Sequence, residues 1–393
     1  MLACTAAVLY TPLERIDRPL VLVDDGVIAE VTSRTRRPVP SRARVVDFGD
    51  SVLAPGFIDI HIHGGAGHDV MESDPGALPG VEALLLKHGV TSYFPTTVTA
   101  PLDATLGALD RLAVAIEARV NGNGRRARPL GIHLEGPFIS HARRGVHPPE
   151  YLLKPTLPMF ERFWQASRGH IKVMTIAPEV EGAQEIIKEA TKRGVCVSLG
   201  HSDADLGAAR SAMAAGARHA THTFNAMRPL SHRDPGILGL VLANANMTAD
   251  IIADGIHVDP AVVELFVKLK GPERAVLITD ATSATGMPDG HYRLGAFELE
   301  VRNGRCILGD KLAGSVLTMD RAVRNIMKFA NLDLQQALRT ATLNPASVVG
   351  ISGRHGVLAS GADADFVVLN RQHEVIQTIV RGGYLYRKTR EPE

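Results

Sequence analysis

The sequence lacks an excess of charge of either sign. It has 43 Lys and Arg residues against 42 Asp and Glu residues, so the formal net charge at pH 7 is only +1. A chain this close to neutral has no overall field that would hold a polyanion or an anionic membrane surface. We therefore expect neither nucleic acid nor a membrane as a partner. No run reaches the ~18 consecutive apolar residues of a membrane-spanning helix.

Cysteine is also scarce. Cys4, Cys196 and Cys306 are an odd number at wide spacing, without a C-x-x-C pair. This pattern supports neither a disulfide framework nor a cysteine-based zinc site, and it predicts a cytoplasmic protein. Residues 1–10 are apolar but have no basic leader before them, so they predict a first β-strand rather than a signal peptide.

What remains is ordinary globular composition, with 45% hydrophobic and 22% charged residues in 393. Such a chain can bury a sizeable core. The length corresponds to two or three domains at about 150 residues each, although a (β/α) barrel can take up most of it as one unit.

Both ends of the chain have β-strand patterns. Residues 20–23 and 27–31 flank an Asp-Asp-Gly turn, and residues 361–369 and 375–380 are typical of further short strands. We expect the two ends, residues 1–54 and 357–393, to pair into one small β-sandwich domain. This domain would bracket a catalytic domain formed by residues 55–356.

Short apolar strands alternate with helical stretches throughout the middle of the chain, which indicates a parallel α/β architecture. The number of strands predicts a closed (β/α)8 barrel. The expected strands are residues 57–63, 91–96, 130–135, 172–178, 195–201, 219–222, 247–254 and 275–280. The clearest helical patterns between them are residues 78–88, 104–118, 183–193 and 260–269.

The first of these strands carries an unusual set of polar residues. Its period of two places isoleucines on one face and Asp59, His61 and His63 on the other. Burying three polar groups is costly unless they have partners, and a metal ion is an effective partner for two adjacent imidazoles. The alternative for this strand alone is an exposed edge strand with hydrogen-bonded histidines.

Other strand ends favour the metal interpretation. His133 and Glu135 end one strand, single histidines follow two more at His201 and His222, and Asp280 follows the last. A (β/α) barrel builds its active site at these carboxyl ends. Together these nitrogen and oxygen ligands, with open coordination positions, suit hydrolysis assisted by Zn²⁺, Fe²⁺, Mn²⁺ or Co²⁺.

The motifs H-x-H, H-L-E-G-P-F, G-H-S-D-A, T-H-T-F-N-A-M, D-G-I-H, T-D-A and L-A-G-S occur in this order. The chain thereby resembles the amidohydrolase superfamily and, within it, the N-acetylglucosamine-6-phosphate deacetylase family. H-x-H and the last aspartate are general to the superfamily, whereas H-L-E-G-P-F and H-x-F-N-A-M are specific to the deacetylases. The resemblance covers nearly the whole chain and implies a distorted (β/α)8 barrel with a β-sandwich made from both termini.

The resemblance also implies residue roles. Glu135, His201 and His222 resemble the family's principal metal ligands. His61 and His63 resemble a pair found in some members only, which implies a second ion bridged by Glu135. We expect one or two divalent ions per chain, with zinc favoured. The metal ligands implied are Glu135, His201, His222, His61, His63 and Asp280.

Asp280 resembles the catalytic acid and base, and His147 resembles the residue that helps to polarise the acetamide carbonyl. The substrate contacts implied are Val146, His147, Asn225, Ala226, Arg233, His257, Leu312, Ala313 and Gly314. His257 and Arg233 resemble contacts near the sugar phosphate. The resemblance implies a homodimer in which Arg233 of one subunit reaches into the phosphate site of the other.

The expected reaction is hydrolysis of the N-acetyl group of N-acetylglucosamine 6-phosphate. Three alternatives remain open at this point: the galacto epimer as substrate, a dihydroorotase-like or N-acyl-amino-acid hydrolase, and a sugar-phosphate-binding regulator without catalysis. Asn225, Arg233 and His257 distinguish the phosphate-binding enzyme from other hydrolases. The full ligand set with Asp280 argues against the regulator.

Overall fold

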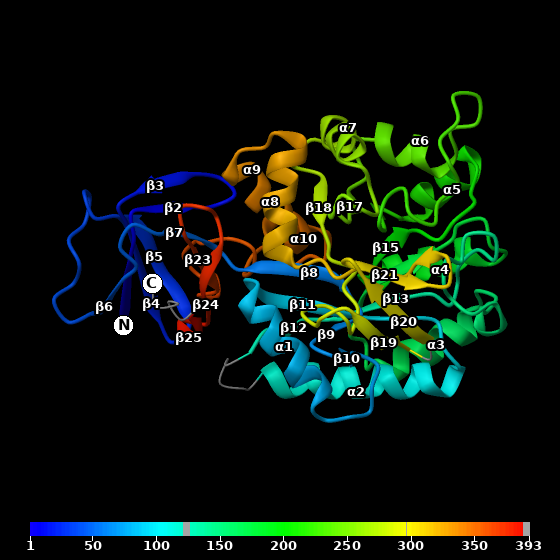
Figure 1. Ribbon diagram of the computed structural model, residues 1–393, viewed down its shortest axis with the longest axis horizontal. Coiled ribbons are helices and arrows are strands. Elements are labelled where there is room, and N and C mark those ends of the chain that lie inside the picture. Colours follow the sequence, from blue (N-terminus) through cyan, green and yellow to red (C-terminus); the bar gives the residue numbers. More distant parts are fainter. Residues whose placement is uncertain (121–125, 296, 388–393) are drawn as a thin grey trace.

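A computed structural model describes residues 1–120, 126–295 and 297–387 of the chain. Figure 1 shows a smaller β-rich part, built from the first residues of the chain and from described residues near its C-terminal end, beside a larger part in which helices surround parallel strands. The larger part comes from the middle of the sequence.

Parallel strands form the centre of the larger part. Strands pair side by side in the order β8, β11, β13, β14, β15 and β16, and β17 pairs with β18. These strands are β8 (Phe57–Ile62), β11 (Val90–Thr97), β13 (Ile132–Glu135), β14 (Ile171–Ile176), β15 (Cys196–Leu199), β16 (His219–Ala220), β17 (Ala249–Ile251) and β18 (Ala275–Leu277). Each corresponds to one of the predicted strands.

The barrel is distorted where β16 meets β17 and where β18 returns to β8. Only one isolated parallel bridge, between Ile62 and Ala281, joins the first strand to the segment after the last. The amide of Asp280 also donates to the carbonyl of His61 over 3.0 Å. The predicted fold, a distorted (β/α)8 barrel, is confirmed.

Helices cover the outside of these strands (Figure 1). They are α1 (Ala77–Lys87), α2 (Leu102–Val120), α3 (Leu157–Ala166), α4 (Ala183–Lys192), α5 (Leu206–Ala215), α6 (Gly236–Ala243), α7 (Pro260–Lys270), α8 (Met319–Ala330), α9 (Leu334–Thr340) and α10 (Leu343–Val348). The four predicted helices correspond to α1, α2, α4 and α7. Several begin at a capping side chain; Asp205, for example, accepts from the amide of Ala208 over 2.7 Å.

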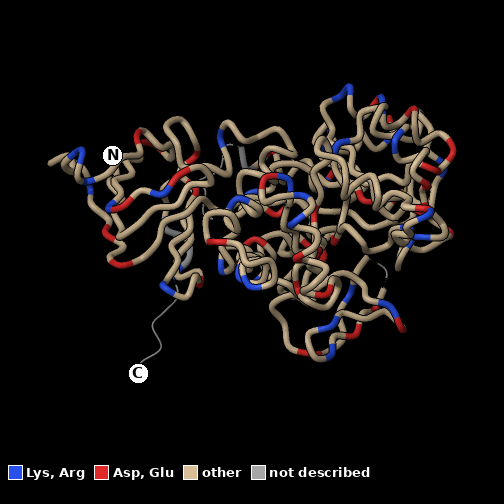
Figure 2. The backbone as a smooth tube through the Cα atoms, turned by 90° about the horizontal axis from the view of Figure 1, so that it is seen from above, with Lys and Arg blue, Asp and Glu red and all other residues tan. Residues whose placement is uncertain are grey.

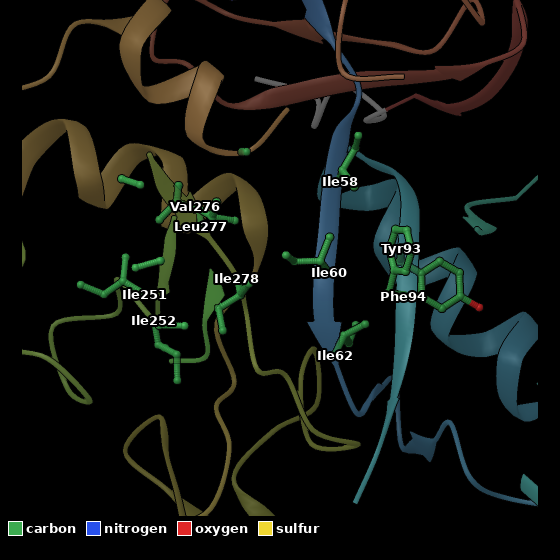
Figure 3. Close-up of a cluster of buried hydrophobic side chains, with 14 of the residues drawn as sticks. Ile58, Ile60, Ile62, Tyr93, Phe94, Ile251, Ile252, Val276, Leu277 and Ile278 are labelled. Atoms are coloured by element: carbon green, nitrogen blue, oxygen red, sulfur yellow. The ribbon is translucent and has the colours of Figure 1, made fainter. Parts of the chain in front are cut away.

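The isoleucines of β8 belong to the main hydrophobic cluster, as the alternation predicted. Ile58, Ile60 and Ile62 are each 1% exposed. Figure 3 shows them along β8, beside Tyr93 and Phe94 of β11. With one side of the strand committed to this core, Asp59 and His61 occupy the other side, also buried. The strand therefore has a fixed register that aims its polar residues at the barrel centre.

Strands from both termini interleave in the β-rich part. One sheet has the order β5-β4-β1-β6 and the other β25-β24-β23-β7-β2-β3. The strands are β1 (Leu2–Thr5), β2 (Val8–Tyr10), β3 (Arg15–Asp17), β4 (Pro19–Asp24), β5 (Val27–Ser33), β6 (Arg44–Asp47), β7 (Val52–Pro55), β23 (Phe366–Leu369), β24 (Val375–Val380) and β25 (Gly383–Arg387). Residues such as Leu9, Leu53 and Phe366 share one hydrophobic cluster. The exact division at residues 54 and 357 stays a prediction.

The predicted Asp-Asp-Gly turn joins β4 to β5. Asp25 and Gly26 have φ values of 45° and 77°. Positive φ at both central residues is the conformation of a tight hairpin turn whose twist matches the flanking strands. A Cβ at Gly26 would approach the Cβ of Arg381 to 3.0 Å, so glycine is also needed here for space.

An antiparallel sheet after the last barrel strand was not predicted. It consists of β19 (Gly290–Leu294), β20 (Phe297–Arg302), β21 (Arg305–Leu308) and β22 (Lys311–Leu312). Its small hydrophobic cluster contains Leu294, Leu299 and Ala313, and Val146 packs against it. Short connecting pieces complete the chain: β9 (Gly64–Gly65), β10 (His68–Asp69), β12 (Arg128–Pro129) and the 3-10 helix Pro149–Tyr151.

Charged residues are mixed over the whole molecule. Figure 2 shows Lys and Arg interspersed with Asp and Glu in both the β-rich part and the barrel. Among the residues that the structure describes, no helix has the length and apolarity needed to cross a membrane. Cys4, Cys196 and Cys306 are all free thiols.

An ion pair joins the end of α1 to α8. His88, which follows α1, contacts Asp320 of α8 over 2.9 Å, and Arg324 donates to the same carboxylate over 3.0 Å. Burial raises the pKa of Asp320, but the contacts with His88, Thr318 and Arg324 together outweigh it and the pKa falls to about 2. Asp320 therefore stabilises the fold in its ionised form.

We predict that Asp320→Asn lowers the free energy of unfolding at pH 7 by about 1–2 kcal/mol. Because the folded pKa lies below the ~3.9 of an unfolded aspartate, this stabilisation is present above about pH 4 and disappears as the pH falls toward 2. Urea unfolding of both proteins at several pH values measures it. Asp310→Asn, at an exposed carboxylate, is the control; a difference that persists unchanged at pH 3 would contradict the assignment.

Candidate metal centre and active site

The polar residues predicted at the strand ends meet in one place. Glu135 ends β13, while His201 and His222 each lie two residues beyond the end of β15 or β16. Asp280 follows β18, and His63 follows β8. All are at most 8% exposed. The carboxyl ends of the barrel strands therefore converge on a buried cluster of imidazoles and carboxylates.

Glu135 is the centre of this cluster. Its Oε1 atom lies 3.2 Å from Nε2 of His201, 3.1 Å from Nε2 of His222 and 3.5 Å from Nε2 of His61. Its Oε2 atom lies 3.2 Å from Nε2 of His63 and 3.7 Å from Nε2 of His147. One carboxylate thus contacts histidines from different strands on both of its oxygens.

Asp280 completes the second half of the cluster. Its Oδ1 atom lies 3.2 Å from Nε2 of His63 and 3.5 Å from Nε2 of His61. His61, His63 and Asp280 form one group whose ligand atoms are close enough to share a metal ion. Glu135, His147 and His201 form another, with His222 within hydrogen-bonding distance of both Glu135 and His201. Two adjoining centres share Glu135 between them.

Backbone carbonyls fix the orientation of three imidazoles. Nδ1 of His63 faces the carbonyl of Thr96 over 3.0 Å, and Nδ1 of His201 faces that of Arg143 over 3.0 Å. Nδ1 of His222 faces the carbonyl of Asn225 over 3.2 Å. A carbonyl accepts only, so each Nδ1 carries a proton, and in the neutral ring Nε2 keeps its lone pair. These lone pairs point into the cluster.

The donor set fits divalent cations. Nε2 of His201 lies 3.0 Å from Nε2 of His222, and Nε2 of His61 lies 3.3 Å from Nε2 of His63. Two such lone pairs repel at this distance unless a positive charge lies beside them. Imidazole nitrogens with carboxylate oxygens are the ligands of zinc and related ions. The residues therefore suit a metal at each of the two centres.

The pKa values of the buried histidines and carboxylates depend on how the negative charge of the cluster is balanced. Burial lowers the pKa of His201 to about 4. Burial also opposes protonation of His222, but hydrogen bonding and charge from Glu135 raise its pKa to about 9. Burial raises the pKa of Asp280, yet the charge of His61 and the contact with His63 lower it to about 2. Where no metal cation is present, protons on imidazoles such as His222 thus balance the ionised carboxylates of the cluster.

The backbone is strained at the strand ends. His201, His222 and Asp280 have φ values of 47°, 31° and 50°, in the left-handed region that costs a residue with a Cβ about 1–2 kcal/mol. Hydrogen bonds compensate: the amide of His222 donates to the carboxylate of Asp250, and the carbonyl of Asp280 accepts from Ser315 over 2.7 Å. Such strain is characteristic of functional sites.

Buried polar groups support the ligands from behind. Asp59 accepts from the amide of His61 over 3.2 Å and from the hydroxyl of Thr279 over 2.5 Å, which ties β8 to the segment that carries Asp280. His133 lies between the carbonyl of Ile60 and the hydroxyl of Thr175, at 3.0 and 2.7 Å. Asp59 and His133 thereby tie neighbouring barrel segments together behind the cluster.

A cavity of about 180 Å³ lies over the cluster. Its lining brings together nearly every residue predicted for the site. The predicted residues that line it are His63, Glu135, Val146, His147, His201, His222, Asn225, Ala226, His257, Asp280, Leu312, Ala313 and Gly314. His61 lies beneath His63, fully buried. The ligand-type residues and the residues proposed for the sugar phosphate thus share one cavity.

Arg233 does not line this cavity. It is exposed, in the loop before α6, and the structure brings it to no other predicted site residue. In the other direction, sequence reasoning missed Val98 and Leu294, which line the cavity, and Thr99, which contacts His147. Apolar and threonine residues carry no signal of chemistry in a sequence, and Leu294 reaches the cavity only through the unpredicted antiparallel sheet.

Comparison with known proteins places this site in a class. The amidohydrolase family model matches residues 52–384, so the chain belongs to the amidohydrolase family. Members of this class are metal-dependent hydrolases, in agreement with the two candidate centres.

Relatives within the class are more specific. The chain is 40% identical to N-acetylglucosamine-6-phosphate deacetylase of Bos taurus over 87% of this chain and 85% of that protein. It is 38% identical to N-acetylgalactosamine-6-phosphate deacetylase of Escherichia coli O157:H7, over 93% and 94%. A mutant N-acetyl-D-glucosamine-6-phosphate deacetylase from Mycobacterium smegmatis, solved in complex with N-acetyl-D-glucosamine 6-phosphate, matches with a TM-score of 0.91 and 33% identity, covering 98% of this chain and 99% of that one.

We predict that Glu135→Gln removes most of the bound metal, because the amide has neither the charge nor the second acceptor oxygen that faces the imidazoles. Elemental analysis of the purified variant, beside circular dichroism to confirm folding, measures this. Glu185→Gln, at an exposed glutamate of α4, should retain its metal. A folded Glu135→Gln protein with the metal content of the wild type would contradict the role of Glu135.

Proposed function

We propose that the chain hydrolyses the N-acetyl group of N-acetylglucosamine 6-phosphate, giving glucosamine 6-phosphate and acetate. One observation carries the proposal: a single cavity is lined both by Glu135, His201 and Asp280 and by Asn225 and His257. An amide-hydrolysing centre and donors for an anion are therefore within reach of one small molecule.

We propose that Glu135, His201 and His222 hold the principal cation, and that His61, His63 and Asp280 hold a second one shared through Glu135. Zinc is favoured over iron, manganese and cobalt because imidazole and carboxylate ligands predominate. A cation held there supplies Lewis acidity toward water and toward the amide carbonyl. Whether the chain holds one ion or two depends on whether a cation occupies the second site, at His61, His63 and Asp280.

Asp280 moves the proton in this proposal. Its carboxylate is ionised, so it accepts a proton as the oxygen of water bonds to the carbonyl carbon. It returns the proton to the nitrogen as the C–N bond breaks, and the amino sugar and acetate are released. His147 lines the same cavity, and we propose that it donates a hydrogen bond to the carbonyl oxygen as negative charge develops there.

The phosphate would lie at the side of the cavity near α7. Nδ2 of Asn225 is buried and has no hydrogen-bond acceptor among the residues that the structure describes. His257 is held by Asp254, whose carboxylate contacts its Nδ1 over 2.7 Å, which directs Nε2 away from Asp254. An unsatisfied amide and an oriented imidazole are suitable partners for phosphate oxygens.

The backbone at Leu312, Ala313 and Gly314 would contact the sugar ring. Gly314 has a φ of 58°, and a Cβ there would approach the carbonyl oxygen of Asp280 to 2.9 Å and a methyl of Thr282 to 2.5 Å. Only glycine therefore lets this segment pass so close to Asp280.

The free cysteine thiols are consistent with the reducing cytoplasm that we propose as the location of the protein.

The galacto epimer is the less favoured substrate, because the bovine relative and the mycobacterial structure both carry the gluco name. A different amide hydrolase would have no use for Asn225 and His257 beside the metal ligands. A regulator without catalysis would not need Asp280 with its lowered pKa.

Acetate release from N-acetylglucosamine 6-phosphate tests the proposal. We expect turnover that a chelator suppresses and zinc restores, and much weaker turnover of the unphosphorylated sugar and of the galacto epimer. Asp280→Asn should lose about 10²–10⁴-fold in kcat, the cost of a lost acid and base. No acetate from the metal-loaded wild type, or half of its rate in Asp280→Asn, would overturn the proposal or the role of Asp280.

We propose further that the working unit is a homodimer in which Arg233 of one subunit serves the phosphate of the other. Arg233 is exposed and outside its own cavity, and a phosphate dianion is better held by a guanidinium than by Asn225 and His257 alone. A two-fold interface would supply two such arginines reciprocally.

We predict that Arg233→Ala raises KM for the phosphorylated sugar more than it lowers kcat, since ground state and transition state share the phosphate contact. Mixing it with Asp280→Asn, under conditions where subunits exchange, should restore activity, because each hybrid dimer then has one intact site. The unmixed parents are the controls. A fully exchanged mixture that is no more active at low substrate concentration than its parents would exclude action across the interface.

A further inference from the structure

His147 stands apart from the other histidines of the site. Its Nε2 lies 3.7 Å from Oε2 of Glu135, and its ring centroid lies 4.6 Å from that of His201. By position alone it can be a metal ligand in the group with Glu135 and His201, or a hydrogen-bond donor to the substrate. The two roles need opposite states of Nε2: a ligand needs a lone pair, and a donor needs a proton.

Thr99 decides between these states. Its backbone amide donates to Nδ1 of His147 over 3.2 Å, and its hydroxyl lies 2.8 Å from the same nitrogen. A backbone N–H can only donate, so Nδ1 of His147 must be an acceptor. The hydroxyl can then only donate to Nδ1 as well. Both Thr99 and His147 are 3% exposed, so water does not compete freely for these contacts.

The consequence is a tautomer opposite to that of the ligand histidines. In His63, His201 and His222, a carbonyl accepts from Nδ1–H and leaves Nε2 bare. In His147, an N–H donates to Nδ1 and leaves the proton on Nε2. A neutral imidazole has one of each, so the partner of Nδ1 fixes the chemistry of Nε2.

We propose that Thr99 is a positioning residue that locks His147 in the Nε2–H tautomer, which keeps His147 out of the metal coordination and makes it a donor into the cavity. The use of this proton at the acetamide carbonyl rests on the proposed function. The position of the proton on Nε2 does not. Thr99 itself touches no substrate in this role; it acts through the imidazole.

Local structure keeps Thr99 in place. It lies two residues beyond the end of β11, where Ala100 and Pro101 lead into α2. Gly136, with a φ of 71°, gives Thr99 room, since a Cβ there would approach the Thr99 hydroxyl to 2.3 Å. The glycine of the E-G-P sequence thus serves the contact between Thr99 and His147.

Nitrogen NMR of the zinc-loaded protein with ¹⁵N-labelled histidine tests the proposal directly. Two-bond correlations distinguish a protonated from an unprotonated ring nitrogen, and the His147 signals are those missing from His147→Gln. We expect a proton on Nε2 and none on Nδ1. A bare or metal-bound Nε2 in His147 would overturn the proposal. This reading needs no substrate, so it stands even if acetate release fails.

Variants of Thr99 test the consequence for turnover. Thr99→Val removes the hydroxyl but keeps the shape, and we expect kcat to fall about three- to ten-fold, the effect of one neutral hydrogen bond. KM and zinc content should stay close to those of the wild type. Thr99→Ser, which keeps the hydroxyl, should recover kcat. Wild-type kcat in Thr99→Val would overturn the proposal.

Thr97→Val is the matched control. Thr97 ends the same strand, and its buried hydroxyl has no hydrogen-bond partner among the described residues. The same change there should leave kcat and the His147 signals as they are in the wild type. Equal losses of kcat in Thr97→Val and Thr99→Val would mean a general packing effect and would also overturn the proposal. If the wild-type protein releases no acetate, the proposed function is wrong. The NMR result then still decides whether His147 is in the Nε2–H tautomer.

Discussion

The contact between the Glu135 carboxylate and the surrounding imidazoles is the constraint on which the rest of the site depends. Both of its oxygens are buried and face histidines from four segments of the chain, so solvent reaches little of this carboxylate. Burying such a charge is costly unless positive charge compensates it. The barrel therefore has to deliver its strand ends to one point, and the left-handed turns at His201 and His222 are part of the cost of doing so.

Much of this arrangement could be predicted from the sequence, because two regularities relate sequence position to position in the fold: the period of two in a strand and the common edge of parallel strands. The period of a strand put His61 on the side opposite to Ile60, and the parallel strands brought Glu135, His222 and Asp280 to one edge of the barrel. The predicted barrel strands correspond to observed ones because most of them are short apolar runs between helical or turn segments.

The rest was set by contacts that leave no local signal. The sheet β19–β22 is a short antiparallel insertion whose strands are only partly buried, so its sequence is hard to distinguish from that of a loop. Leu294 lines the cavity only because this sheet forms. Thr99 acts on His147 through its backbone amide and its hydroxyl, and neither group marks a residue as functional in a sequence. The roles of the histidines differ through the partner of Nδ1, which is a carbonyl for His201 and an amide for His147, and no spacing in the sequence encodes this.

The order of strands in the β-rich part affects how the protein is made. β7 lies between β2 and β23, so a strand from the first part of the chain has one neighbour that emerges from the ribosome only after the whole barrel has been synthesised. Until then, the edge of β7 and apolar residues such as Leu53 have no cover. The barrel segment is thus translated before the partners of the N-terminal strands exist, and β23, β24 and β25 complete the sheet afterwards.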